Sequence, residues 1–158
     1  MTNMNIHFRR VTQSDIKKFP EWYERIGGPA LFSNYIPSTF VSFEESNDLL
    51  WFIILDGDDE IGTIWFETKI PKEANYDLGI YLNRPDLFGK GIGGLAIRSA
   101  MDTILSEKDA QELYLNVRKE NLRAIRCYEK LGFETVQEGE KVTPTGIIKF
   151  QRMQLRDN

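Results

Sequence analysis

The residues of this chain best suited to chemistry form a glycine-rich segment that leads directly into a helical pattern. Four glycines, at positions 89, 91, 93 and 94, precede the amphipathic run Leu95–Met101. A glycine-rich turn before a helix directs several backbone N–H groups to one point, where the helix dipole also favours an anion. No acidic residue lies between Leu87 and Met101, whereas Lys90 and Arg98 are basic. The segment therefore predicts a seat for a phosphate or pyrophosphate group.

Two well-known phosphate motifs do not fit this segment. A P-loop needs Ser or Thr directly after its lysine, but Lys90 lies between two glycines. A Rossmann motif needs its glycine turn in the first unit of alternating strands and helices, and the chain before Gly89 does not alternate in that way. Glycines also occur in ordinary loops and in close helix packing, so the segment alone leaves both interpretations open.

A second candidate group lies about 30 residues further along the chain. At about 100° per residue, Asn121, Ala124 and Tyr128 share one face of a predicted helix. Asn121 is a good N-cap, and Gly132 is a good residue to end the helix. Three basic residues lie on the opposite face and are interpreted as solvated: Arg123, Arg126 and Lys130. Tyr128 could be a core residue or a functional donor, and this helix alone does not decide.

Taken together, the two segments resemble the GNAT superfamily of acetyl-CoA-dependent N-acetyltransferases. The shared pattern is strand, Gly-x-Gly loop, helix and strand, then Asn-x-x-Ala-x-x-x-Tyr-x-x-x-Gly-Phe ending at Phe133. The family usually has Gln or Arg at the head of its glycine signature, where this chain has Phe88. An aromatic residue there is similar to the branch that acetylates ribosomal proteins. The run Asn121–Lys130 is also similar to aminoglycoside 6′-N-acetyltransferases.

The resemblance implies where acetyl-CoA would bind. In the family the loop seats the pyrophosphate, and backbone amides beside a splay between the fourth and fifth strands stabilise the oxyanion. The expected cofactor-binding residues are Ile80, Tyr81, Leu82, Phe88, Gly89, Lys90, Gly91, Ile92, Gly93, Gly94, Asn116, Asn121 and Ala124. Gly79 interrupts the fourth strand, where we expect a bulge to open the ladder. No metal is expected.

Two residues are expected to act in the reaction itself. The family's later tyrosine faces the thioester sulfur, and this role falls to Tyr128. A tyrosine with a pKa of about 10 facing a thiolate of about 8.5 makes proton transfer unfavourable by about 2 kcal/mol. Tyr128 therefore has a perturbed pKa or acts chiefly as a hydrogen-bond donor. The acceptor amine needs a base, for which Asp77 is the candidate and Glu67 the alternative, through desolvation or a water relay.

The acceptor is less well defined by the sequence. Aromatic and acidic residues gather near the N-terminus: Trp22, Tyr23, Phe32, Tyr35, Phe40 and Phe43 with Glu21, Glu24, Glu44 and Glu45. They suit a cationic amine or polyamine, although core aromatics and surface acids would give the same composition. Three functions stay open: a small-molecule amine acetyltransferase working by direct attack in a ternary complex, a protein N-terminal or ribosomal-protein acetyltransferase, and a non-catalytic acyl-CoA-binding module.

Composition narrows the classes further. A length of 158 residues suits a single domain (1–158), and a net charge of −4 argues against a nucleic-acid binder. Cys127 is the only cysteine and is expected to be a structural thiol, and the only histidine, His7, has no partner at metal-ligand spacing. No apolar run is long enough to span a membrane. We therefore expect a cytoplasmic enzyme whose partners are acetyl-CoA and an amine acceptor, with a homodimer as a further possibility.

The elements that must position these residues follow from periodicity and turn signals. We expect an α+β fold: a GNAT-type mixed, mainly antiparallel seven-stranded sheet with helices on both faces. The expected strands are 6–11, 49–55, 60–67, 76–83, 113–117, 134–142 and 147–155. The expected helices are 12–23, 30–35, 91–106 and 121–131. Asp56–Asp59 predicts a hairpin turn.

Overall fold

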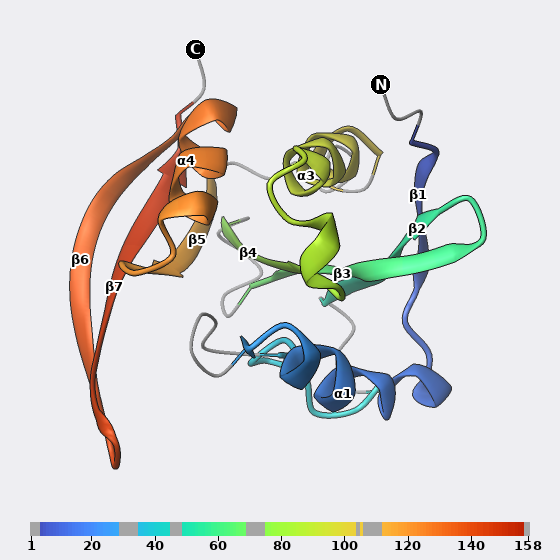
Figure 1. Ribbon diagram of the computed structural model, residues 1–158, viewed down its shortest axis with the longest axis horizontal. Coiled ribbons are helices and arrows are strands. Elements are labelled where there is room, and N and C mark those ends of the chain that lie inside the picture. Colours follow the sequence, from blue (N-terminus) through green and yellow to red (C-terminus); the bar gives the residue numbers. More distant parts are fainter. Residues whose placement is uncertain are drawn as a thin grey trace.

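The chain folds into one mixed sheet of seven strands with helices on both faces, which confirms the predicted α+β class (Figure 1). The computed structural model describes residues 4–28, 35–44, 49–68, 75–103, 105 and 112–156. The strands are β1 (Ile6–Arg10), β2 (Leu50–Asp56), β3 (Asp59–Glu67), β4 (Asn75–Leu82), β5 (Glu112–Arg118), β6 (Phe133–Thr143) and β7 (Gly146–Leu155). The helices are η1 (Gln13–Asp15), α1 (Lys18–Arg25), η3 (Pro85–Leu87), α3 (Ile92–Thr103) and α4 (Leu122–Leu131).

The strand order is β1-β2-β3-β4-β5-β7-β6, and all neighbours are antiparallel except β4 and β5. The predicted turn between β2 and β3 is present, with Gly57 at a φ of 61°. Only glycine adopts such a backbone without steric cost. Strand bounds agree with the prediction to within about two residues.

The first helical segment differs from its prediction. The sequence predicts one helix over 12–23, whereas the structure has the short turn η1 followed by α1. Pro20 explains the break, because a residue without an N–H is tolerated only in the first turn of a helix. With α1 beginning at Lys18, Pro20 lies in that turn. The second predicted helix, at 30–35, lies outside the described residues except for Tyr35.

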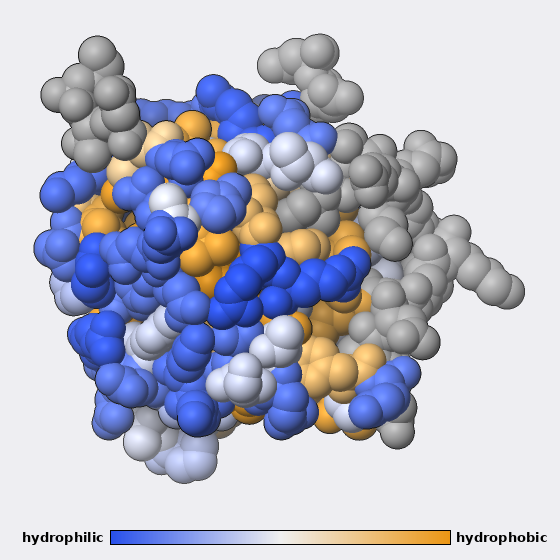
Figure 2. Space-filling model, turned by 90° about the vertical axis from the view of Figure 1, so that its right-hand side faces the viewer, coloured by the Kyte–Doolittle hydropathy of each residue, from blue (hydrophilic) through white to orange (hydrophobic). Residues whose placement is uncertain are grey.

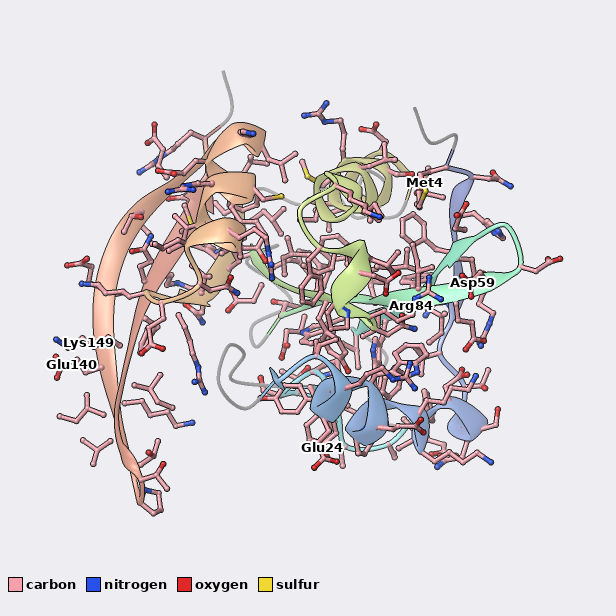
Figure 3. All side chains as sticks on the ribbon, viewed as in Figure 1. Met4, Glu24, Asp59, Arg84, Glu140 and Lys149 are labelled. Atoms are coloured by element: carbon pink, nitrogen blue, oxygen red, sulfur yellow. The ribbon has the colours of Figure 1, made fainter. Side chains whose placement is uncertain are left out.

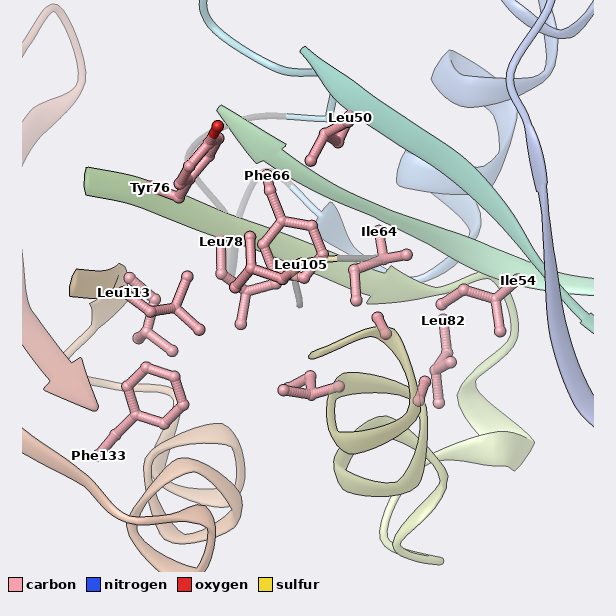
Figure 4. Close-up of a cluster of buried hydrophobic side chains, with 14 of the residues drawn as sticks. Leu50, Ile54, Ile64, Phe66, Tyr76, Leu78, Leu82, Leu105, Leu113 and Phe133 are labelled. Carbon is pink, nitrogen blue, oxygen red and sulfur yellow. The ribbon is translucent and has the colours of Figure 1, made fainter. Parts of the chain in front are cut away.

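One hydrophobic core lies between the sheet and α3 (Figure 4). Phe66 of β3, Leu78 of β4 and Leu113 of β5 are buried there against Ala96 and Ile97 of α3. Side chains alternate between the two faces of a strand, so the neighbouring residues of β4 point to the other face. Helix α3 therefore covers one face of the sheet, and this packing brings the glycine loop before α3 close to β4.

A second core lies on the opposite face of the sheet, under α1. Phe19 is fully buried and stacks on Trp51 at a ring-centroid distance of 4.9 Å. Trp22 and Tyr81 complete this core from α1 and β4. Much of the aromatic content of the N-terminal region is thus used to attach α1 to the sheet.

The sheet opens between β4 and β5. Their parallel ladder has only three residue pairs, which end at Asp77 and Tyr114. The splay implied by the family resemblance is therefore present, but the predicted bulge at Gly79 is wrong, because β4 stays in register with β3 from Asp77 to Leu82. Glycine is required at position 79 for another reason: a Cβ there would collide with the ring of Trp65. Gly79 therefore leaves room for the ring of its cross-strand partner Trp65, next to the splay.

Strands β6 and β7 form a long hairpin beyond the last neighbouring helix (Figure 1). Glu140 and Lys149 are cross-strand partners on this hairpin and lie together, away from the helices (Figure 3). Strand β6 is an edge of the sheet, and nearly all of its eleven residues are exposed or half-buried. The hairpin lines the space beside the splay with some of its side chains, and most residues of β6 are exposed to solvent.

The molecule also presents a face beside β1, on which hydrophilic residues predominate with hydrophobic patches between them (Figure 2). None of the helices in the described part of the chain is long and apolar enough to cross a membrane.

Candidate active site

A cavity of about 610 Å³ lies beside the glycine loop, which we call the cofactor cavity. The loop, the start of α3, one face of α4 and residues 80–82 of β4 line it. Of the expected cofactor-binding residues, it brings together Ile80, Tyr81, Leu82, Phe88, Gly89, Gly91, Ile92, Gly93, Gly94, Asn121 and Ala124. Two of the expected residues lie outside it. Lys90 is exposed to solvent, and Asn116 lines a different cavity.

The glycines of the loop differ in backbone conformation and in the space around them. Gly89 and Gly91 have φ values of 75° and 78°, which turn the chain into α3. A Cβ on Gly93 would meet no atom within 4 Å, so the space beside it is open. A Cβ on Gly94 would lie 3.5 Å from the Cys127 sulfur, an ordinary van der Waals contact, so α3 and α4 pack side by side at this point. Open space beside a helix N-terminus is the arrangement that an anionic group needs.

Basic side chains border the cofactor cavity, and three of them are exposed to solvent as the sequence predicts. The basic residues in the lining are Arg98, Arg123, Arg126 and Lys130. The Arg123 guanidinium lies 4.2 Å from the centre of the Phe88 ring. Phe88 thus orients a cation at the place where the family signature usually has a polar side chain.

The sequence contains a signal for Arg123 that the prediction overlooked. Asn121 is the N-cap of α4 and accepts a hydrogen bond from the Ala124 amide at 3.3 Å, so Arg123 lies in the first turn. A cation in that turn opposes the helix dipole. Its position is therefore unfavourable for the helix itself and favours an interaction with an anion.

Backbone amides of β4 point into the splay. The Asn83 amide donates to the Ile61 carbonyl at 2.9 Å, toward β3. Amides alternate in direction along an antiparallel strand, so Tyr81 also points toward β3, while Ile80 and Leu82 point the other way. The expected group of three amides is thus reduced to Ile80 and Leu82.

Tyr128 lies where the cofactor cavity meets a second cavity of about 1070 Å³. Only three residues of the described linings belong to both cavities: Ile80, Asn121 and Tyr128. The Tyr128 ring packs edge-on against Phe133 at a centroid distance of 6.0 Å. Burial, and to a smaller extent the neighbouring Cys127 thiol, raises the pKa of Tyr128 well above the usual tyrosine value. Its hydroxyl therefore keeps its proton at neutral pH and can donate a hydrogen bond.

The second cavity, which we call the acceptor cavity, lies on the other side of the splay. Side chains from β3, β4, β5, β6 and β7 line it, including both expected candidates for the base, Asp77 and Glu67. Asn116, expected at the cofactor, lies here instead. The β6–β7 hairpin contributes residues such as Lys141, Phe150 and Arg152. Because the lining comes from strands far apart in sequence, no local motif predicts it.

Asp77 is paired with Arg152. Two guanidinium nitrogens of Arg152 donate to the two oxygens of Asp77 at 2.9 and 3.1 Å. Arg152 also donates to Asn116 Oδ1 at 3.2 Å, and its guanidinium lies 4.4 Å from the centre of the Tyr114 ring. The sequence prediction missed this pair because 75 residues separate its members.

Glu67 is buried and already satisfied. Its carboxylate accepts hydrogen bonds from Trp65 Nε1 at 2.7 Å, Ser38 Oγ at 2.7 Å, the Thr39 amide at 3.1 Å and the Ser38 amide at 3.3 Å. Four donors on one carboxylate attach the turn at 38–39 to β3. Glu67 is therefore a structural residue of the acceptor cavity, and Asp77 is the more accessible of the two carboxylates.

The predicted acceptor pocket of N-terminal aromatics and acids stays a prediction that neither cavity supports. Among the described members of that set, none lines either cavity. Trp22, Phe40 and Phe43 pack in or against the core under α1. The Tyr23 ring packs against Tyr35 and Tyr81, and Glu21 forms an exposed ion pair with Arg25. Phe32 and Glu45 lie outside the described residues. The sequence left two interpretations open, an acceptor pocket or core aromatics with surface acids. The contacts of these residues favour the second.

Among the residues that the structure describes, Cys127 and His7 have no catalytic arrangement around them. Burial raises the pKa of the Cys127 thiol, so the reactive thiolate is disfavoured. The thiol packs between α3 and α4 beside Gly94. His7 is exposed on β1, and its Nε2 lies 2.6 Å from the Gly57 carbonyl oxygen. Both residues have the structural positions that the sequence predicts.

A splayed sheet with a glycine-lined cavity on one side, and a second cavity that shares Tyr128 with it, is an arrangement that suits an enzyme with two substrates. The chain belongs to the GNAT acetyltransferases: the family model described as "Acetyltransferase (GNAT) domain" matches residues 5–134. The predicted family is thereby confirmed, and the chain is an acetyl-CoA-dependent N-acetyltransferase.

Two relatives illustrate the range of the similarity. An aminoglycoside N(6′)-acetyltransferase type 1 of Klebsiella pneumoniae is 38% identical over 168 aligned residues, which cover 92% of this chain and 81% of that protein. A spermidine N(1)-acetyltransferase of Escherichia coli is 45% identical over 56 residues, but these cover only 35% of this chain and 29% of that protein.

Solved structures agree in fold. An aminoglycoside acetyltransferase in complex with coenzyme A has a TM-score of 0.70 at 21% identity, with 94% of each chain covered. A spermidine N-acetyltransferase from Vibrio cholerae, in complex with CoA and spermine, has a TM-score of 0.72 at 20% identity, with 95% of this chain and 94% of that chain covered. At these identities the similarity establishes the GNAT fold.

Proposed function

We propose that this enzyme transfers the acetyl group of acetyl-CoA to a primary amine of a small polycationic acceptor, by direct attack within a ternary complex. One observation carries the proposal: Tyr128, Ile80 and Asn121 line both cavities. Two substrates bound in adjoining cavities can react directly, because their reacting groups are held together without an enzyme-bound intermediate. The half-buried thiol of Cys127, whose pKa is raised by desolvation, gives no support for a covalent alternative.

The cofactor cavity fits acetyl-CoA by the chemistry of its lining. The open space at Gly93, the two left-handed glycines and the basic border suit a phosphate-rich ligand. When bound, acetyl-CoA supplies the acetyl group in activated form as a thioester. We assign its phosphates to the loop amides and Arg123, and the polar groups near the thioester to the amides of Ile80 and Leu82. Asn121 and Ala124 border the same cavity from α4.

Tyr128 is proposed as the hydrogen-bond donor to the leaving sulfur. Its raised pKa favours this role over full proton transfer, because a weaker acid donates a hydrogen bond but releases its proton less readily. The same burial disfavours charge on a nearby sulfur, so a donor at this point has a large effect. Of the two roles that the sequence left open, donation is the one we propose.

Asp77 is proposed as the group that receives the proton of the acceptor amine, through water. Glu67 accepts four hydrogen bonds and is enclosed, whereas Asp77 keeps 38% of its side-chain surface in solvent. The proton passes from the ammonium nitrogen to the carboxylate, and the neutral amine then attacks. This role requires that Asp77 exchange its pairing with Arg152 for the acceptor.

The relatives support the class of acceptor. The names of the aminoglycoside and spermidine N-acetyltransferases both specify amines that carry several positive charges. A carboxylate in the acceptor cavity suits such amines. Protein N-termini and ribosomal proteins remain the competing acceptors, suggested by Phe88 and by the acid Asp77 near the start of the fourth strand. The Phe88 ring lies beside the Arg123 guanidinium, which gives this aromatic residue a second explanation.

The test is an acceptor screen with acetyl-CoA and detection of free thiol, run over aminoglycosides, polyamines, amino acids and peptides with free N-termini. We expect kanamycin or spermidine to be acetylated, with intersecting lines in initial-velocity plots of the two substrates. Parallel lines would contradict the ternary complex. Preference for a neutral or anionic amine would contradict the acceptor class and leave the family intact.

A further inference from the structure

The acceptor cavity contains a cation that belongs to the chain itself. The Arg152 side chain, from β7, extends across β5 to Asp77 on β4. Three kinds of group surround its guanidinium: the Asp77 carboxylate at 2.9 and 3.1 Å, the Asn116 amide oxygen at 3.2 Å, and the Tyr114 ring at 4.4 Å. A carboxylate, an amide oxygen and an aromatic face together are a recognition site for an organic cation.

These three groups are positioned by the sheet rather than by Arg152. Asp77 and Tyr114 are the last residue pair of the β4–β5 ladder. Asn116 is two residues further along β5, so its side chain is on the same face as that of Tyr114. The Tyr114 hydroxyl is held by Glu112 Oε2 at 2.7 Å. Departure of the arginine would therefore leave the three groups in place.

The contact with Arg152 can be displaced. The side chains of Arg152 and Asp77 keep 26% and 38% of their surface in solvent, and such partly exposed ion pairs are weakened by screening. The hairpin holds Arg152 only at its backbone, and the side chain can turn about several bonds. A second cation brought into the same cavity can therefore compete for Asp77.

We propose that Asp77, Asn116 and the Tyr114 ring form a cation subsite of the acceptor cavity, which Arg152 fills in the free enzyme and which an ammonium group of the acceptor takes over on binding. The inference rests on the proposed function, because it takes the acceptor to be a cationic amine and Asp77 to be the carboxylate that faces it. Arg152 then acts as a specificity-determining residue: only a cation can release Asp77, so neutral amines do not gain access to the base.

The other charged residues of the acceptor cavity make Asp77 important for binding a cationic acceptor. Besides Arg152, its described lining includes three more positively charged residues: Arg118, Lys141 and Arg156. Glu67 is satisfied by neutral donors, so Asp77 is the carboxylate with which an ammonium can pair. The affinity for a polycation therefore includes the cost of displacing Arg152, as for any site whose competent state is only partly populated.

The first experiment measures binding rather than turnover, by titrating spermidine or kanamycin calorimetrically into the CoA-saturated enzyme. Arg152→Gln removes the competing charge at similar size, and we expect about tenfold tighter binding of the polycation. Arg152→Lys keeps a charge but loses the planar, two-pronged contact, and we expect an increase of about threefold. If Arg152→Gln does not fold, judged by circular dichroism and melting temperature, the lysine variant still gives the test.

The matched control is Arg156→Gln. Arg156 lines the same cavity but pairs with Glu134 at 3.3 Å instead of Asp77. A gain there as large as in Arg152→Gln would overturn the inference, since it would reflect only the general charge of the cavity. Unchanged or weaker polycation binding in Arg152→Gln would also overturn it. Asp77→Asn added to Arg152→Gln should remove the gain.

A second arm separates this inference from the proposed function. If the wild-type enzyme neither binds nor acetylates polycations, the proposed acceptor class fails, and the subsite is then judged with ethylguanidinium as an analogue of the arginine side chain. In Arg152→Ala we expect ethylguanidinium to bind at millimolar concentration and to shift the NMR signals of Tyr114 and Asn116. Absence of binding, or binding that persists after Asp77→Asn is added, would overturn the subsite.

Discussion

The two cavities on either side of the splay are built in different ways. The cofactor cavity consists largely of backbone, glycines and one helix face, from a few segments close together in the chain. The acceptor cavity consists of side chains from five strands, held by contacts such as Asp77–Arg152 and Ser38–Glu67. A site made of backbone tolerates many side-chain changes, whereas a site made of side chains can be altered by one substitution. The difference predicts where mutations will affect each substrate.

The largest effect is expected at Tyr128, where the cavities meet. Tyr128→Phe should lower kcat by about 10²–10³-fold with little change in acetyl-CoA affinity, because the hydroxyl matters mainly when the sulfur becomes negative. The ring contact with Phe133 remains, so the melting temperature should hardly change. Steady-state kinetics and calorimetry measure both quantities. Tyr35→Phe, outside both linings, is the control; more than half of wild-type kcat in Tyr128→Phe would exclude the donor role.

The pH profile gives a second measurement of the same residue. Because burial raises the pKa of Tyr128, the hydroxyl stays protonated through and beyond pH 10, the ordinary tyrosine range. The rate should therefore rise with pH as the amine loses its proton and then level off. A fall below pH 9 that disappears in Tyr128→Phe would show that the tyrosine ionises much earlier than its environment indicates.

A large effect is also expected at Gly91, where the backbone itself forms the site. Gly91→Glu should weaken acetyl-CoA binding by about 100-fold or more, because it adds bulk and a negative charge to the phosphate seat. Gly57→Glu is a matched control, since both glycines have a left-handed φ, 78° and 61°, and open space around them. Both variants should lose about 1–2 kcal/mol of stability. Equal acetyl-CoA affinity in the two would place the seat elsewhere.

The acceptor cavity should respond at Glu67 without any effect on the cofactor. Glu67→Gln leaves donors of Ser38, Thr39 and Trp65 incompletely paired, at a cost of about 1–3 kcal/mol in unfolding free energy. We expect KM for the acceptor to rise about tenfold while acetyl-CoA affinity stays the same. Chemical denaturation and kinetics test this together. A loss of kcat without any loss of stability would instead favour Glu67 as the base.

A smaller, salt-dependent effect is expected at Arg123. Arg123→Ala should weaken coenzyme A binding by about five- to tenfold at low salt and less at high salt, as for one exposed charge near a phosphate. Phe88→Leu should have part of this effect, because it removes the ring that orients the guanidinium. Arg25→Ala, on the opposite face of the sheet, is the control. Calorimetry at two salt concentrations decides, and no difference between the arginine variants would contradict the assignment.

The smallest effect is expected at Gly93, where stability and binding should change in opposite directions. Gly93→Ala places a methyl group in open space on a helix, so stability should rise by about 0.5 kcal/mol. The same methyl group narrows the phosphate seat, and acetyl-CoA affinity should fall about threefold. Melting curves and calorimetry measure the two changes. A rise in both quantities would show that the open space is not part of the cofactor site.

Local sequence predicted most of the cofactor cavity, for a physical reason. A glycine loop, a helix cap and a helix face are set by residues within a few positions of one another, so spacing predicts the turn at Gly91 and the shared face of Asn121 and Tyr128. The resemblance to the family then implied that these two segments meet at one cofactor. The order of elements and the antiparallel sheet followed from similar local signals. Pro20 could also have been interpreted correctly, because the position of a proline within a helix is a local constraint.

The acceptor cavity could not be predicted in the same way. Arg152 and Asp77 meet only because β7 lies beside β5 and β5 beside β4, an arrangement that no local pattern encodes. Gly79 was misassigned for the same reason, since the ring that covers it belongs to the neighbouring strand β3. Where several strands each supply one side chain, the strand order has to be known first.

The exposed edge formed by β6 has a consequence for the behaviour of the protein in concentrated solution. An unpaired edge of eleven residues is a template on which another chain can add a strand. Four charged residues are distributed along it, Glu134, Glu138, Glu140 and Lys141, and charge on an edge opposes such association. High salt screens this protection, so colloidal stability should fall with ionic strength even where the fold is unaffected. The hairpin that completes the acceptor cavity is thus also the part of the described sheet at which we expect association between copies to begin.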